Sequence, residues 1–172
     1  MDVKSLNNTL RDEAITMGLC AGWQRMWKKG WDRTELIQKF KEGIDFCIQH
    51  DYPKNDFIKK NFTRDLLREN GILVDDERSL LNKRMCVLQG ASEAIVRYNA
   101  WNVGTVYIRH NSHAIVTAKN MAFVIVRLFD NAEVECSTQD KASIVVLRHN
   151  EKTKVLKHEG NVKITDEFDY LK

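Results

Sequence analysis

Proline is nearly missing from this chain, which has one proline and eight glycines among 172 residues. That composition excludes a collagen-like chain and a Pro/Gly-rich disordered chain. The longest apolar run, Met121 to Val126, is far below the roughly 20 residues that a membrane helix needs. The N-terminus, Met-Asp-Val-Lys-Ser, lacks the hydrophobic segment of a secretory signal. We therefore expect a cytoplasmic protein that makes no membrane contact.

Neither half of the sequence has a large excess of one charge sign. Residues 1–83 contain 15 lysines and arginines against 14 acidic residues, and residues 84–172 contain 12 against 10. Proteins that bind nucleic acid usually concentrate basic residues in one segment or on one face. The mixed charge therefore predicts no nucleic-acid partner.

Cysteine motifs for metal or redox chemistry are also missing, because no two of the four cysteines form a C-x-x-C pair. Each cysteine lies among apolar neighbours, as a buried free thiol does. No histidine lies beside one in the sequence to act as the base that a nucleophilic thiol needs. We predict buried structural thiols and no cofactor; the residues are Cys20, Cys47, Cys86 and Cys136.

Two further groups of polar residues could carry chemistry. His110, His113 and His149 fall at predicted corners, but a metal site usually needs three or four convergent donors. Glu133 and Glu135 would lie about 7 Å apart on one face of a strand, as a glycosidase's paired carboxylates can. We therefore expect solvated histidines and no metal. Because alternating charges are common on an outer strand face, we also expect no catalytic residue.

Helical spacing of apolar residues dominates residues 1–80, for which we predict about three helices. The first covers residues 5–29, where Gly18 and Gly22 weaken the case for one uninterrupted helix. The second follows a capping box, Asp32 with Glu35, and ends before Pro53. The third begins near residues 55–56 and ends at Gly71.

Trp23, Trp27 and Trp31 fall within nine residues of the first two predicted helices. Such a cluster is typical of an aromatic core between two helices. The alternative is a stacking or partner-binding face.

The second half repeats a short phrase, a small residue followed by alternate apolar residues. The first positions are Ala94, Gly104, Ala114, Ala122, Ala132 and Ala142, with steps of 10, 10, 8, 10 and 10 residues. Alternation within each phrase predicts short strands, and Asn or Asp between the strands predicts tight corners. A fixed period with small residues facing one way favours a narrow coil of stacked strands. An antiparallel meander is the alternative.

The fold class predicted is therefore α+β, with a helical domain or cap at residues 1–80 packed on a short parallel β-helix at residues 81–172. The last part of the β-helix is an irregular, charged tail after residue 150. A coil with two faces separates the outward residues into two sets. One set is too apolar for bare solvent, which predicts that helices or a second copy cover it. The candidate interaction surface comprises Tyr107, Phe123, Ile125, Val145, Leu147, Trp23 and Trp27.

Three segments carry a resemblance to a family of proteins. "GIDFCIQHDYPKNDFIKKNF" (43–62), "GTVYIRHNSHAIVTA" (104–118) and "FDNAEVE" (129–135) resemble uncharacterised proteins of gut anaerobes and their phages or mobile elements. The resemblance covers residues 11–148. It implies a short C-terminal β-solenoid, no assigned activity and no site residues.

The sequence thus predicts a non-catalytic protein-interaction or assembly module with a protein partner or a homo-oligomer. One alternative is a phage or mobile-element accessory protein that binds a host factor. A carbohydrate-active enzyme is the other.

Overall fold

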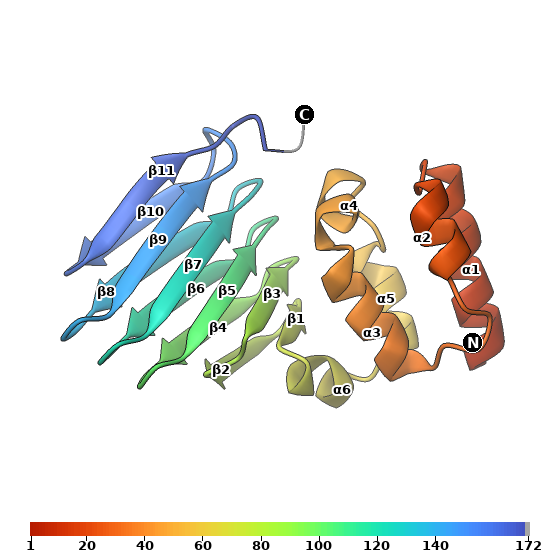
Figure 1. Cartoon of the computed structure of the whole chain (residues 1–172), viewed down its shortest axis with the longest axis horizontal. Helices are drawn as coiled ribbons and strands as arrows, with labels where there is room; N and C mark the ends of the chain where they lie inside the picture. The colour runs from red at the N-terminus through yellow and green to blue at the C-terminus, as the bar shows by residue number, and fades with distance from the viewer. Residues whose placement is uncertain (171–172) are drawn as a thin grey trace. The chain divides into compact units, whose positions relative to one another are not determined.

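The computed structural model describes residues 1–170 and contains two compact units. Residues 1–67 form a helical unit, and the second unit, which begins at Arg68, contains a β-solenoid (Figure 1). The division precedes the predicted boundary at residues 80–81, because strands β1 (Ile72–Val74) and β2 (Glu77–Leu81) already belong to the solenoid. The segment that these strands span includes three consecutive acidic residues, Asp75 to Glu77, which are uncommon in strands.

The helical unit contains shorter helices than predicted, because each expected helix is broken once. Gly18, with φ of +92°, separates the first two helices, and Gly43 caps the third. Phe62 is in an extended conformation at the next break. The helices are α1 (Val3–Thr16), α2 (Ala21–Met26), α3 (Arg33–Glu42), α4 (Ile44–Gln49), α5 (Asn55–Asn61) and α6 (Arg64–Glu69), the last of which spans the boundary between the units. No helix among residues 1–170 has the length and apolarity needed to cross a bilayer.

The predicted capping box is confirmed at the start of α3. The Asp32 carboxylate accepts from the Glu35 N–H at 2.9 Å, and the Glu35 carboxylate accepts from the Asp32 N–H at 2.9 Å. Both donors would otherwise be unsatisfied at a helix N-terminus. The sequence therefore marks this helix start correctly.

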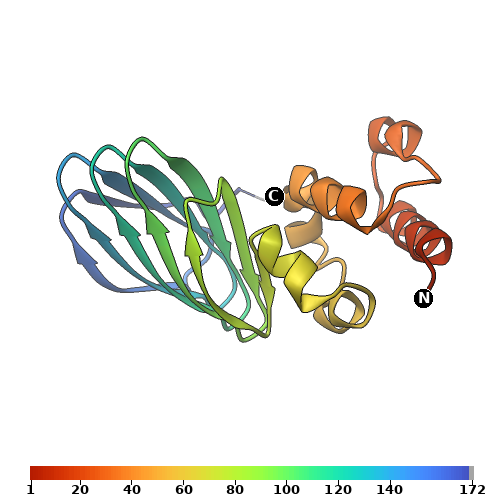
Figure 2. The same ribbon diagram turned by 90° about the horizontal axis from the view of Figure 1, so that it is seen from below.

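The chain in the solenoid alternates between two sheets (Figures 1 and 2). Sheet A contains β1 (Ile72–Val74), β3 (Met85–Gln89), β5 (Val103–Ile108), β7 (Phe123–Leu128), β9 (Ser143–Arg148) and β11 (Val162–Asp166). Sheet B contains β2 (Glu77–Leu81), β4 (Glu93–Tyr98), β6 (His113–Ala118), β8 (Glu133–Thr138) and β10 (Lys154–Glu159). Every strand pair among residues 72–166 is parallel, which confirms the β-solenoid and excludes the antiparallel meander.

The regular part of the solenoid repeats every 20 residues, with one strand of each turn in each sheet. Ala94 pairs with Ala114 and Ala114 with Val134, while Gly104 pairs with Val124. The eight-residue step inferred from the sequence is therefore wrong. Ala122, Ala132 and Ala142 are buried corner residues. Each lies two residues before the strand position that the eight-residue step assigned to it.

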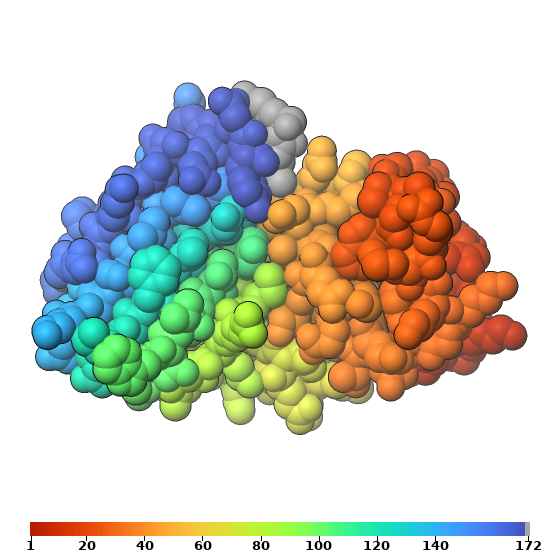
Figure 3. All heavy atoms as spheres, viewed as in Figure 1, coloured from red at the N-terminus to blue at the C-terminus, as the bar shows by residue number. Residues whose placement is uncertain are grey.

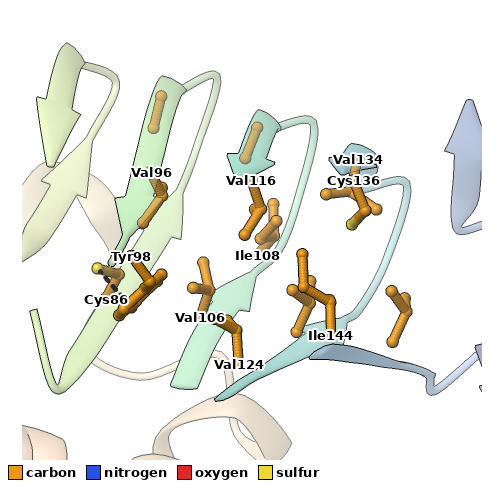
Figure 4. Packing of buried hydrophobic residues seen from close by; sticks show 14 of the residues in the cluster. Cys86, Val96, Tyr98, Val106, Ile108, Val116, Val124, Val134, Cys136 and Ile144 are labelled. Carbon is orange, nitrogen blue, oxygen red and sulfur yellow. Dashed lines mark hydrogen bonds between the residues drawn. The ribbon is translucent and has the colours of Figure 1, made fainter. Parts of the chain in front are cut away.

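The interior of the solenoid is a narrow apolar column built from the alternate residues of both sheets (Figure 4). Val96, Val106, Val116 and Val126 are completely buried in it. The largest interior side chain is that of Tyr98, whose hydroxyl donates to the Lys83 carbonyl at 2.7 Å.

Gly104 provides the space for Tyr98. A Cβ atom on Gly104 would lie 2.2 Å from Cε1 of the Tyr98 ring. One turn further, Ala118 occupies the place of Tyr98 and Val124 the place of Gly104. A large residue thus meets a small one in each turn, as a column of fixed width requires.

The corners are stabilised by side chains that bond to the neighbouring turn. In five successive corners the residue at the left-handed position has φ between 54° and 61°, namely Ala100, His110, Asn120, Asp130 and Asp140. His110 Nδ1 accepts from Gly90 N–H at 3.0 Å, and Asp130 Oδ2 accepts from His110 N–H at 2.9 Å. Asp140 Oδ2 accepts from Asn120 N–H at 3.1 Å. Asn and Asp therefore mark the corners, as predicted, but these side chains bond across turns as well as tolerating the conformation.

We predict that Gly104→Val destabilises the solenoid by about 1–3 kcal/mol or more, because the added methyl groups overlap the Tyr98 ring. Tyr98→Ala alone should cost about 3–5 kcal/mol through the cavity that it leaves. The double variant recreates the Ala118–Val124 pair of the next turn, so its loss should be smaller than the sum of the single losses. Urea denaturation of the three variants measures this coupling, and strictly additive losses would contradict the packing described.

Candidate interaction surfaces of the solenoid

The outer face of sheet A carries most of the apolar residues singled out from the sequence. Stacking places Thr105, Ile125 and Val145 in one column, flanked by Met85 and Lys163. Ile125 and Val145 are half-buried and Phe123 is exposed, whereas Tyr107 and Leu147 are buried. The predicted surface therefore divides into an accessible part and a buried part.

Trp23 and Trp27 lie in the helical unit, where both are half-buried. Trp27 Nε1 donates to Asn7 Oδ1 at 2.6 Å, and its ring lies 5.1 Å from that of the buried Trp31. Lys39 Nζ lies over both the Trp23 and the Trp31 rings. These contacts correspond to the aromatic core between helices that the sequence predicts.

The segment after β11, residues 167–170, covers one part of sheet A. The Tyr170 ring lies 4.5 Å from that of His149 and 4.3 Å from the Arg127 guanidinium carbon. His149 also stacks on Phe129 at 4.4 Å, and its Nδ1 lies 3.1 Å from the Glu167 carbonyl oxygen. The expectation that His149 is a solvated corner residue is therefore wrong, because the ring is buried in this cluster.

The outer face of sheet B is mostly polar, but it includes the paired neighbours Ile95 and Ile115 and the exposed Leu81, which pairs with Arg97. Glu133 Oε1 accepts from Lys154 Nζ at 2.8 Å, and this bond holds the pKa of the Glu133 carboxyl below its ordinary value. Glu135 Oε1 lies 3.7 Å from His113 Nε2. A glycosidase needs one carboxylic acid with a raised pKa, and the bond to Lys154 shifts the pKa of Glu133 in the opposite direction.

The described residues contain no group of three or more His, Cys, Asp or Glu side chains that could hold a metal ion. All four cysteines are free. Cys47, Cys86 and Cys136 are buried as predicted, but Cys20 is exposed because it precedes α2 as its N-cap. The burial of Cys136 raises the pKa of its thiol to about 12.

One exposed apolar cluster was only partly predicted from the sequence, which singled out Phe123 alone among its residues. Trp101 is 77% exposed and Val103 is 60% exposed, and Met121 and Phe123 lie beside them in the next turn. The Met121 N–H donates to the Ala100 carbonyl at 3.0 Å, which stacks the two corners. The erroneous eight-residue step concealed that residues 101–103 and 121–123 are neighbours. The available signal was a large apolar residue at each of two corners 20 residues apart, Trp101 and Met121.

The C-terminal end of the solenoid is the second surface that the repeat pattern did not single out. Val155, Val162 and Ile164 pair with interior residues of the preceding turn, so their side chains point into the column. Ile164 is nevertheless 38% exposed, and Val155 and Val162 are only half-buried. At the opposite end, the interior residues Leu73 and Leu80 are buried.

Comparisons with protein-family models, curated proteins and solved structures find no match to this chain. The resemblance to proteins of gut anaerobes and phages thus stays an expectation from the sequence.

We predict that a thiol reagent at pH 8 labels Cys20 rapidly in the folded protein and leaves the buried cysteines unmodified. Since only the thiolate reacts, a pKa of about 12 leaves roughly one Cys136 side chain in ten thousand ionised at that pH. Mass spectrometry after alkylation counts the labelled sites, with urea-unfolded protein as the control for all four. Rapid labelling of Cys136 in the folded state would contradict its burial.

Proposed function

We propose that this protein is a non-catalytic protein-interaction or assembly module, and that the C-terminal end of its solenoid is the contact surface. The observation that supports the proposal is the exposure of Ile164, since its partner Val146 and the other interior residues of β5, β7 and β9 are buried. Apolar side chains are left accessible at the position where the next turn would cover them.

The backbone of this end supports the same proposal. β10 and β11 are the last strands of their sheets, so the outer side of each has no strand partner among the described residues. In β11 the Asn161 carbonyl and the Glu167 N–H bond to β9, which leaves the alternate groups, including those of Ile164, facing outward. A partner surface that also has open strand edges and an apolar column between them can therefore pair with this end of the solenoid.

A second copy of the chain meets that requirement. Charges of both signs flank the column, among them Lys163, the Lys157–Glu159 ion pair and Asp166, which lies 3.2 Å from Arg148. The same surface on both copies can therefore pair unlike charges across a two-fold axis. The β-bulge of β10 between Val155 and Lys157 makes its edge irregular, so β11 is the more regular edge for pairing. The buried interior at the other end favours a closed dimer over a filament.

We predict a concentration-dependent dimer in sedimentation velocity, and that Ile164→Lys raises its dissociation constant at least about tenfold by placing an unpaired ammonium group in the interface. Ile115→Lys is the matched control, because Ile115 is 37% exposed but lies on the outer face of sheet B. Circular dichroism verifies that both variants fold.

A strictly monomeric protein at all concentrations would overturn the proposed self-association. Equal weakening by Ile115→Lys would place the interface elsewhere.

A further inference from the structure

One edge of the solenoid consists of the corners that join the ends of the sheet B strands to the starts of the sheet A strands. This edge combines apolar and basic side chains. Its apolar part is the cluster of Trp101, Val103, Met121 and Phe123 described above. We call it the corner edge, and define it by these four residues and the cations around them. It belongs to the solenoid alone, and its apolar residues lie in the turns of β4–β5 and β6–β7, not in the C-terminal turn of β10 and β11.

Four exposed cations surround the apolar cluster. Arg84 and Lys141 lie in the corners of the preceding and following turns, and Arg97 and Lys119 lie at the ends of β4 and β6. Within residues 1–170 none of these four side chains forms an ion pair, in contrast to Lys154 on the outer face of sheet B. The one acidic residue in these corners, Asp140, already accepts from the Asn120 N–H.

We infer that the corner edge docks this protein onto an anionic lipid surface. Tryptophan is favoured at the membrane–water interface, where its ring enters the acyl boundary and its indole N–H stays hydrated. Lysine and arginine beside the inserted residues attract anionic headgroups. The inference goes beyond the proposed self-association, and it reverses the expectation of no membrane contact drawn from the sequence.

The geometry favours a lipid surface over a peptide. The cluster lies on corners at the margin of the solenoid, where the green and teal residues meet the outline in Figure 3. A peptide generally needs a groove or pocket for its apolar side chains. A bilayer accepts a protruding edge, because headgroups and acyl chains rearrange around it.

The test is sedimentation of the purified protein with vesicles of equimolar phosphatidylcholine and phosphatidylglycerol, and with pure phosphatidylcholine vesicles. We expect binding to the anionic vesicles, a decrease in binding as salt increases, and little binding to phosphatidylcholine alone. Trp101 emission should shift to shorter wavelength on binding, and Trp101→Phe should remove most of that shift. No binding to the anionic vesicles would overturn the inference.

Matched variants locate the contact. Phe123→Ser should weaken binding, whereas Ile115→Ser, at a residue of nearly equal exposure on sheet B, should not. Lys119→Gln with Lys141→Gln should weaken binding about 30-fold, since each cation near an anionic surface contributes about a factor of five. Lys28→Gln with Lys29→Gln changes the net charge equally in the helical unit and should have little effect.

Equal weakening by both lysine pairs would reduce the contact to unspecific charge attraction and overturn the assignment to the corner edge. Binding to a single-stranded oligonucleotide instead of vesicles, lost in the same corner-edge variants, would also overturn it. Dimerisation is measured without lipid and is sensitive to Ile164, so either proposal can fail while the other stands.

Discussion

Parallel stacking in register at a fixed 20-residue repeat is the constraint on which the rest of this structure depends. Because each turn bonds to the next along both sheets, every strand residue of an inner turn has an equivalent directly above and below it. An interior position must then fit a column of constant width. Tyr98 and Gly104 satisfy this jointly, since the large ring fills the space that the missing side chain leaves. The corners are subject to the same rule, and Asp130 and Asp140 bond to the turn before them.

The same constraint determines which surfaces are available for binding. Outward residues form columns, so single apolar residues in successive turns add up to a continuous patch, as Trp101 and Val103 do with Met121 and Phe123. A stack of parallel turns also has two ends, where strand edges and interior side chains lose their neighbours. One end has a buried interior, whereas Ile164 at the other is partly accessible. Both proposals arise from places where the repeat stops or changes residue type.

The solenoid could be predicted from the sequence because its signals are local. These signals are the alternation of apolar residues within each strand and the regular spacing of the strands. The outward residues of the two faces were separated correctly, since Ile95 and Ile115 share sheet B while Ile125 and Val145 share sheet A. The alignment of the repeats was harder to predict. Alanine fits both the second strand position and the last corner position, so Ala114 and Ala122 appeared equivalent when they are not.

Burial of individual residues was also beyond the sequence, because it depends on segments far apart in the chain. His149 is covered by Tyr170, which lies outside the repeats altogether. Tyr107 and Leu147 have the alternation of exposed strand residues yet are buried. The breaks in the helices at Gly43 and Phe62 likewise have weak local signals, since the apolar spacing continues across them.

The central claim, parallel stacking of every second strand, is tested most directly by disulfide cross-linking between introduced cysteines. Ile115 and Glu135 are paired neighbours on sheet B, so Ile115→Cys with Glu135→Cys should form an intramolecular disulfide under mild oxidation. Ile115→Cys with Ile125→Cys should form none, because Ile125 lies on the opposite sheet, although an antiparallel meander would make these two neighbours. Mass spectrometry of the non-reduced digests separates the cases. The account predicts the 115–135 cross-link alone, and a 115–125 cross-link without the other would contradict it.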